Sequence, residues 1–593
     1  MIWSISKSFM NWSSPGPPRQ LEVKSEKGLK LLTKARDIAK TMNEYFISKV
    51  QNIVKGLRVL PINLTGCKKI MEGKKVTVSL EFVTVNRVKK LLSQLKNKKS
   101  ISIDQLDNFS VKLASDYLAE PLHHVISLSI MQQKFPSCWK LTKIVPLHKK
   151  QSTLKPENYR PVAILSPLSK ILEKVVYEQI YHYFSKNKIF HPALHGYRGG
   201  RSTTTALLTM YDKLVKASSK GQLSGVVLVD LSAAFDLVSP DILVKKLRIY
   251  GFKEDIITWI CSYLSDRYQS VWIDHIFSDL LPNNMGVPQG SNLGPLLFLI
   301  FFNDLPCCIN EKIECYADDS TIVAAGKNVA EVGRKLSEDC DNLSDWMASN
   351  SFKLNAGKTH FLTMGTRIKL AGLTEAMEVV MDGVVLEESK EKSEVLLGIK
   401  IQNNLEWLSQ IEVLRMKLKK RLGGLANLKR IMGFKDKKGI VQGVFNSVLC
   451  YCLPLFGGCS NTDLKTLQVM QNKAAQITLS MPPRSHRDHM YDRLKWLTVN
   501  QLIVYHTLLS IHRIKKSGEP EYLASILGKT SRQVVGGIIV ENIKHGLVRK
   551  SFTFRGAEQW NKLPMRLRIE TKLSRFKIGV NVWVNEHVPR FLP

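Results

Sequence analysis

Two adjacent aspartates, Asp318 and Asp319, interrupt a stretch of strand-forming residues and constrain the fold more than any other feature of the sequence. Short apolar runs flank the pair, which favours two strands joined by a tight turn with the acids at its tip. A third acid, Asp230, ends the apolar run 225–229, which is typical of a buried strand. Hard carboxylate oxygens suit divalent cations, and two such cations about 4 Å apart assist in-line displacement at phosphorus. The three acids therefore predict a two-metal site for nucleotidyl transfer.

The charge of the chain indicates a polyanionic partner. Its 593 residues include 86 Lys and Arg against 51 Asp and Glu, a formal net charge of +35. A protein that works against polyphosphate tolerates this excess most easily, so nucleic acid is the first expected partner and an anionic membrane surface the alternative. The longest apolar run, 293–302, contains Gly and Pro and is too short to span a bilayer. We expect no membrane segment, and an intracellular protein of the nucleus or cytoplasm.

The ten cysteines show no regular spacing, which predicts reduced thiols instead of a disulfide framework. Cys450, Cys452 and Cys459, with His486 and His489 downstream, come nearest to a zinc site. Their C-x-C start differs from the usual spacing, so small buried hydrophobes are the better interpretation.

Apolar periodicity divides the chain. A helical pattern near residues 31–50 is followed by a basic loop at 55–80 and a second helix from Val85. Helical stretches then alternate with short strands from about residue 136 to 400, which is an α/β pattern. Leucines three or four apart from residue 405 predict a long basic helix. The expected segments are an N-terminal basic extension, a catalytic core, a helical domain and a C-terminal extension, at residues 1–95, 96–400, 401–480 and 481–593.

Other motifs around the three acids agree with a known family. Phe235 follows Asp230 by five residues, and Tyr316 precedes the aspartate pair, as in polymerase motifs A and C. Further blocks match in order and spacing, at residues 155–161, 195–203, 286–296, 355–359 and 397–399. The ensemble resembles the reverse transcriptases of non-LTR (LINE-type) retrotransposons. The resemblance implies a right-hand polymerase with α+β palm and fingers, a helical thumb and a mostly helical C-terminal extension that binds nucleic acid.

The resemblance also implies roles for the acidic residues and the aromatic. Asp230 and Asp318 would coordinate two Mg²⁺ ions, with Mn²⁺ as an alternative, and Asp319 would support the site. Phe235 would lie under the sugar and exclude a 2′-hydroxyl, or else be a core aromatic. Asp236 is interpreted as structural.

Four residues are expected to bind the nucleotide beside Phe235. Lys149 and Arg160 best match the cations that hold the triphosphate, although Lys143 and Lys150 compete with Lys149. Gln289 and Gly290 lie in a Gly/Pro-rich turn, where the missing Cβ of glycine would let the base pair and template approach. A plain turn is the alternative for that segment.

Four more residues have roles implied by the same resemblance. Arg198 would contact the template, or be a surface residue. Lys358 would protonate the departing pyrophosphate as a general acid, or anchor a phosphate. Leu397 and Gly398 would form the primer grip, a hairpin that holds the primer end.

The implied reaction is RNA-templated DNA synthesis, with an RNA template, a DNA primer at its target and deoxynucleoside triphosphates as partners. The residues before the core show no array suited to an endonuclease, so a separate endonuclease is expected. Two rivals are another palm polymerase, such as a group II intron maturase or a viral RNA-dependent RNA polymerase, and a catalytically silent RNA-binding relic. Phe235 weighs against the viral enzyme, and the retained acids weigh against the relic.

Overall fold

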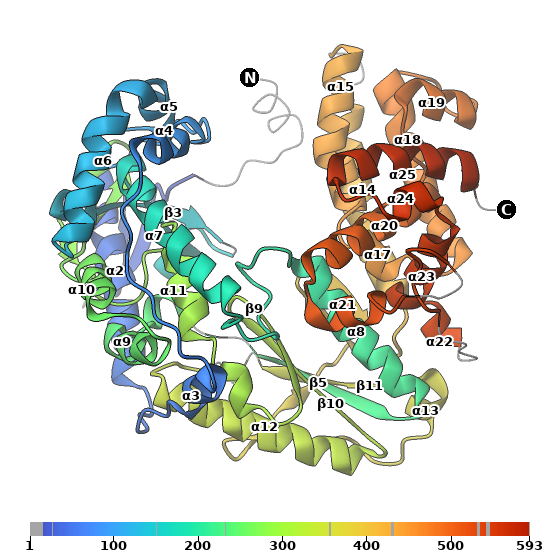
Figure 1. Ribbon diagram of the computed structural model, residues 1–593, viewed down its shortest axis with the longest axis horizontal. Helices are drawn as coiled ribbons and strands as arrows, with labels where there is room; N and C mark the ends of the chain where they lie inside the picture. Colours follow the sequence, from blue (N-terminus) through green and yellow to red (C-terminus); the bar gives the residue numbers. More distant parts are fainter. Residues whose placement is uncertain are drawn as a thin grey trace.

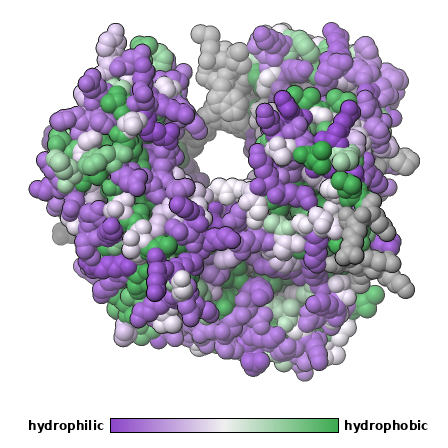
Figure 2. Space-filling model, viewed as in Figure 1, coloured by the Kyte–Doolittle hydropathy of each residue, from purple (hydrophilic) through white to green (hydrophobic). Residues whose placement is uncertain are grey.

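The computed structural model describes residues 16–25, 28–149, 151–229, 231, 233–354, 357, 359–427, 432–530, 534–540 and 546–591. Two arms rise from a central β-sheet, with the N-terminal half of the chain in one arm and the C-terminal helices in the other (Figure 1). A hollow remains between the arms when all atoms are drawn, and hydrophilic residues predominate along its sides (Figure 2). No helix in the described part of the chain is long and apolar enough to cross a bilayer.

The central sheet has the strand order β14-β11-β5-β10-β9. Its strands are β5 (Leu223–Val229), β9 (Lys312–Tyr316), β10 (Asp319–Gly326), β11 (His360–Met364) and β14 (Glu387–Glu388). Alternate residues face opposite sides of a strand. Accordingly Val227 and Ile322 pack into one core with helix α12 (Val329–Ser349), while Val226 and Val323 pack into another with helix α8 (Thr203–Ser219). The predicted strand at 225–229 is confirmed, and both faces of the sheet are buried.

A second sheet lies in the N-terminal arm, in the order β4-β3-β6-β7 with β8 beside β6. Its strands are β3 (Leu141–His148), β4 (Tyr159–Ile164), β6 (Tyr268–Ile273), β7 (Ile276–Phe277) and β8 (Leu281–Pro282). Helix α2 (Ala35–Lys55) packs on this sheet through Met42 and Phe46, which share a core with Ile144 and Val271. The side chain of Asn43 donates a 2.9 Å hydrogen bond to the carbonyl of Asp279. Residues far from the family blocks thus cover this sheet.

Two local predictions in this region are wrong. The first helix does not begin near residue 31, because β2 (Gly28–Leu32) pairs with β1 (Leu21–Ser25) and places Leu21 in the core. The expected loop at 55–80 contains helix α3 (Thr65–Met71), which buries Cys67. The predicted helix from Val85 is confirmed as α4 (Val85–Ser93).

The other helices of the N-terminal arm and its base surround the core that contains Val227 and Ile322. They are α5 (Asn108–Leu113), α6 (Ser115–Met131), α7 (Pro167–Lys186), α9 (Pro240–Ile249), α10 (Glu254–Leu264) and α11 (Gly294–Phe301). The run that contains α11 is buried in this core, not in a membrane-spanning helix.

The second arm, which we call the helical arm, begins with α14 (Leu408–Ala426) and confirms the predicted long helix. It continues with α15 (Phe434–Val441), α16 (Ser447–Leu449), α17 (Leu453–Phe456), α18 (Asn461–Leu479), α19 (Arg487–Leu494), α20 (Val499–Ser517), α21 (Glu521–Leu527), α22 (Gly546–Arg549), α23 (Phe552–Lys562), α24 (Met565–Arg568) and α25 (Leu573–His587). Leu414, Leu467, Leu508 and Trp560 belong to one hydrophobic core. That core extends across residue 480, where two segments were expected to meet.

Candidate active site

The aspartate pair lies where the sequence predicts it, at a hairpin between β9 and β10. Asp319 pairs with Tyr316, which leaves Ala317 and Asp318 as the two-residue turn. Ala317 has φ of 58°, a left-handed conformation that side chains other than glycine adopt at a cost. Both carboxylates are exposed to solvent. The hairpin therefore presents two acids together at the end of the central sheet.

A preceding loop supports this hairpin through its backbone. The Cys315 amide donates to the carbonyl of Ala193 at 2.9 Å, and the His195 amide donates to the carbonyl of Cys315 at 2.8 Å. A Cβ atom on Gly196 would lie only 2.5 Å from the amide nitrogen of Ala317. Glycine is thus required at residue 196, where the loop meets the turn that carries the acids.

Beneath the tip, a buried charged network joins the same loop to β9 and α8. The ring of His195 donates from Nε2 to Glu314 at 2.7 Å, and Lys213 forms an ion pair with the other oxygen of that carboxylate. Burial lowers the pKa of His195, so the ring is neutral. Burial also opposes ionisation of Glu314, but the His195 hydrogen bond and the Lys213 charge outweigh it and hold the Glu314 pKa below its usual value. The network fixes the strand that leads to the acids.

The third predicted acid, Asp230, lies outside the described residues, as does Lys358. Val229, the last described residue before Asp230, pairs with Ser320, the residue after Asp319. No group of three or more His, Cys, Asp or Glu suited to a metal ion occurs within the described ranges. The exposed oxygens of Asp318 and Asp319 have the chemistry that a divalent magnesium ion needs, so the residues present fit such an ion.

An aromatic floor adjoins the acids. The ring of Phe235 stacks on Phe298 with centroids 4.3 Å apart, and Tyr197 meets it edge-on at 6.0 Å. Burial, followed by the charge of Asp318, raises the pKa of Tyr197, which follows the Gly196 that meets Ala317. Tyr197 and Phe235 therefore form a half-buried aromatic surface that extends from the aspartate hairpin.

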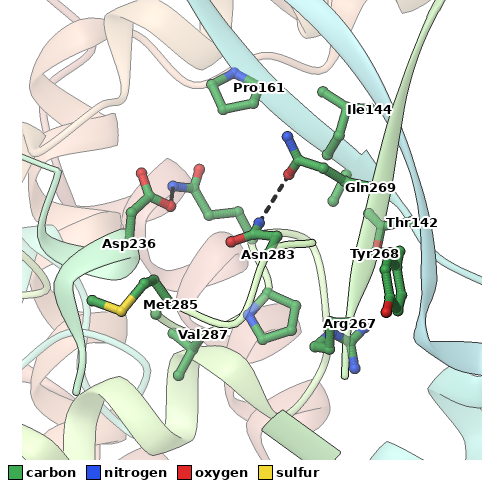
Figure 3. Close-up of a pocket in the computed structure, with 14 residues that line it drawn as sticks. Thr142, Ile144, Pro161, Asp236, Arg267, Tyr268, Gln269, Asn283, Met285 and Val287 are labelled. Carbon is green, nitrogen blue, oxygen red and sulfur yellow. Dashed lines mark hydrogen bonds between the residues drawn. The ribbon is translucent and has the colours of Figure 1, made fainter. Parts of the chain in front are cut away.

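Beyond Phe235 a small cavity of about 50 Å³ lies between the second sheet and the loop at residues 285–289 (Figure 3). Gln289 donates to Asp236 at 2.7 Å across it. Burial raises the pKa of Asp236, although Gln289, Lys49 and Arg160 oppose the shift. Asp236, interpreted from the sequence as structural, is thus the hydrogen-bond partner of a predicted nucleotide-binding residue.

Gly290 lies against the backbone of β4. Its φ is 102°, and a Cβ there would lie 2.6 Å from the carbonyl oxygen of Ala163 in β4. The missing side chain was expected to leave room for the base pair and template. In the structure it brings the loop against the second sheet.

Two predicted triphosphate ligands lie close together at the loop end of the β3–β4 hairpin. The Lys149 amide donates to the carbonyl of Asn158 at 2.8 Å, and Arg160 pairs with Leu147 in the ladder. Both side chains are exposed. Arg160 acts electrostatically on Asp236, as does Lys49 from helix α2. The charges of Arg160 and Lys49 therefore both favour the ionised form of Asp236.

The predicted hairpin at Leu397 and Gly398 is confirmed, between β15 (Ser393–Leu396) and β16 (Ile399–Gln402). Both turn residues have positive φ, 48° and 81°, which matches the twist of a tight two-residue turn. Tyr451 donates to the carbonyl of Leu397 at 2.6 Å. Leu397 also lines a small cavity together with Asp319. The fold thus brings this hairpin beside the aspartate pair, although the two lie far apart in sequence.

Arg198 has a different environment from the one predicted. Its guanidinium donates to the carbonyl of His191 at 3.0 Å and to Glu519 at 2.9 Å, and its side chain is 9% exposed. Arg201 also donates to Glu519, at 2.8 Å. These protein acceptors hold the guanidinium and join the hairpin-supporting loop to the helical arm. The template contact expected of Arg198 stays a prediction.

The cysteines near the proposed zinc spacing are packed against other groups. Burial raises the pKa of the Cys450 and Cys459 thiols to about 12, which disfavours the thiolate that zinc requires. The hydroxyl of Thr204 lies 3.3 Å from the sulfur of Cys452.

Three residues near the site were missed by sequence reasoning. Tyr197 lies inside the family block at residues 195–203, and that block could have indicated its position next to Phe235. Lys49 and Tyr451 lie outside every block, and only the fold brings them to Asp236 and Leu397.

Comparison with known proteins identifies the central region. Residues 147–401 match the family described as Reverse transcriptase (RNA-dependent DNA polymerase). The chain is 26% identical over 461 residues to the probable RNA-directed DNA polymerase from transposon BS of Drosophila melanogaster, covering 74% of this chain and 49% of that protein. It is 24% identical over 498 residues to the polymerase from mobile element jockey of the same species, covering 81% and 52%. The central region is therefore similar to reverse transcriptases, and the chain is similar to the polymerases of these mobile elements.

The chain spans about half the length of the curated relatives it matches. Its similarity to them continues beyond the family match, since more than seven tenths of the chain aligns. The aspartate hairpin, the aromatic floor and the Leu397–Gly398 turn all lie within the matched family region.

Proposed function

We propose that the protein is an RNA-directed DNA polymerase that extends a DNA primer with deoxynucleoside triphosphates on an RNA template. In this proposal the central sheet is the palm, the second sheet with its helices is the fingers, and α14 to α18 are the thumb. The observation that carries it is the exposed Asp318–Asp319 hairpin, which shares a small cavity with Leu397 and which the loop of Gly196 and Tyr197 connects to Phe235.

Asp318 and Asp319, together with Asp230, would hold two Mg²⁺ ions. Bound there, the ions would lower the barrier to attack on the α-phosphate and stabilise the leaving oxygen. The fit rests on the donor chemistry of the two exposed carboxylates.

The residues around the acids would position the substrates. Phe235, held against Phe298, would exclude a 2′-hydroxyl by occupying the space under the sugar. Arg160 and Lys149 would bind the triphosphate from the fingers, with Arg160 offering a bidentate fork. The Leu397–Gly398 turn would hold the primer end next to Asp319. Lys358 would protonate pyrophosphate.

The expected partners are an RNA template and a DNA primer at its target site, in the nucleus or cytoplasm. The strongly basic composition supports nucleic-acid binding. The relatives, by name, are polymerases of mobile elements. A separate endonuclease remains part of the proposal.

Substitution of the hairpin acids tests the proposal. In a primer-extension assay with Mg²⁺, Asp318→Asn/Asp319→Asn should abolish DNA synthesis and preserve RNA binding. Asp274→Asn is a matched control, because Asp274 is an exposed acid in the two-residue turn between β6 and β7. If the double variant extended primers as well as the control does, the assigned site would be wrong.

A further inference from the structure

A cavity of about 540 Å³ lies between the start of α8, the turn from α16 to α17 and the second half of α20. Its size falls in the range of ligand pockets, roughly 300–1,000 Å³. The helix α20 and the turn lie beyond the family match, which ends at residue 401. The cavity is therefore partly built by the helical arm.

The α20 wall of this cavity is basic. His506, Arg513 and Lys516 line it, spaced so that they lie on one side of the helix. Burial, followed by the charge of Arg513, lowers the pKa of His506 to about 4, so the positive charge at neutral pH comes from Arg513 and Lys516. Both of these side chains are exposed, and neither forms an ion pair within the described part of the chain.

The remaining walls add no negative charge. Arg201 lines the cavity, but Glu519 already accepts its hydrogen bonds. Among the described lining residues there is no Asp or Glu. Thr204 from the first turn of α8 faces this space, where the positive end of the helix dipole also favours an anion. Two unpaired cations in a cavity without carboxylates are suited to phosphate groups.

The cavity is adjacent to the proposed primer grip. Cys450 and Cys452 line the cavity. The hydroxyl of Tyr451, between them, donates a hydrogen bond to the carbonyl of Leu397. Leu397 in turn shares a small cavity with Asp319. Tyr451 thus connects the wall of this cavity to the turn that adjoins Asp319.

We propose that this cavity binds backbone phosphates of the primer DNA strand, a short distance upstream of its growing end. The identity of the strand as primer rests on the proposed function. The proposed binding of phosphate groups rests on Arg513 and Lys516 alone, so DNA-binding measurements can test it without any polymerisation.

Charge reversal in the full-length chain tests the cavity. Arg513→Glu/Lys516→Glu is compared with Lys245→Glu/Lys253→Glu, which makes the same charge change at an exposed lysine of α9 and one at the start of α10, in the other arm (Figure 1). Fluorescence anisotropy with a labelled DNA primer annealed to RNA gives Kd over a series of KCl concentrations. The slope of log Kd against log salt should fall by about 1.5 for the cavity variant, from roughly 0.7–0.9 for each lost phosphate contact. Equal slopes for cavity variant, control and wild type would overturn the proposal.

Neutral methylphosphonate linkages identify the strand with the wild-type protein, without relying on any variant's folding. When single linkages are replaced one at a time, replacement at one or two neighbouring primer positions should weaken DNA binding by the wild-type protein. The same replacements should not weaken binding by Arg513→Gln/Lys516→Gln any further. Sensitive linkages found only in the RNA strand, or none, would overturn the assignment. A protein that failed to polymerise but showed the expected linkage pattern would refute the proposed function and support the cavity.

Discussion

Replacing Gly196 with alanine tests how the aspartate hairpin is held in place. The new Cβ would lie 2.5 Å from the Ala317 amide nitrogen, about 0.9 Å closer than ordinary van der Waals contact allows. Both backbone segments are tied by the hydrogen bonds of Cys315 to Ala193 and His195, so the displacement must reach the turn. A misplacement of about 1 Å at a reacting centre costs on the order of 100-fold in rate. We expect Gly196→Ala to slow nucleotide incorporation by about that factor.

The assay is single-turnover incorporation of one deoxynucleotide on a primed RNA template, with RNA affinity measured in parallel. Gly199→Ala is the matched control in the same loop, because its Cβ would meet only the side-chain hydroxyl of Tyr181, at 3.1 Å. RNA affinity should be unchanged in both variants. An incorporation rate for Gly196→Ala equal to that of Gly199→Ala would refute the reasoning.

Three further substitutions give distinct results. The pKa of Glu314 is lower in the folded protein than in the unfolded chain. Ionised Glu314 therefore stabilises the fold above its unfolded-state pKa, and this stabilisation is lost as the pH falls through its folded-state pKa. Glu314→Gln should lower the melting temperature at neutral pH and flatten the dependence of the melting temperature on acidic pH. Melting curves that stay parallel across acidic pH would contradict this. Tyr451→Phe removes a hydrogen bond to Leu397 worth about 1 kcal/mol and should raise the KM for primer about fivefold, leaving the KM for nucleotide unchanged; steady-state titrations of each substrate distinguish the two. Phe235→Val should reduce the preference for deoxynucleotides over ribonucleotides, in kcat/KM, by about tenfold or more; an unchanged ratio would assign the ring to the core.

Local patterns predicted the elements whose signals lie within a few residues. Short apolar runs on both sides of Asp318 and Asp319 predicted the hairpin, and the leucine spacing from residue 405 predicted α14. The start of the first helix was missed because pairing of β2 with β1 prevailed over helical periodicity. Such pairing depends on a neighbouring strand, which helical spacing does not include.

The site residues show the same division. Leu397 and Gly398 form the predicted turn because their conformation is set locally. The environment of Arg198 depends on Glu519, 321 residues away in sequence, and that of Asp236 on Gln289, 53 residues away. No local spacing indicates which distant acceptor a buried arginine will meet, so its role in the structure could not be predicted.

The most direct test of the central claim is extension of a DNA primer on an RNA template by the wild-type chain, with deoxynucleotides and ribonucleotides offered in separate reactions containing Mg²⁺. We expect a ladder of DNA products from deoxynucleotides and little extension with ribonucleotides. Tight, salt-sensitive RNA binding without incorporation of either nucleotide would contradict the polymerase assignment and indicate a silent RNA-binding relic.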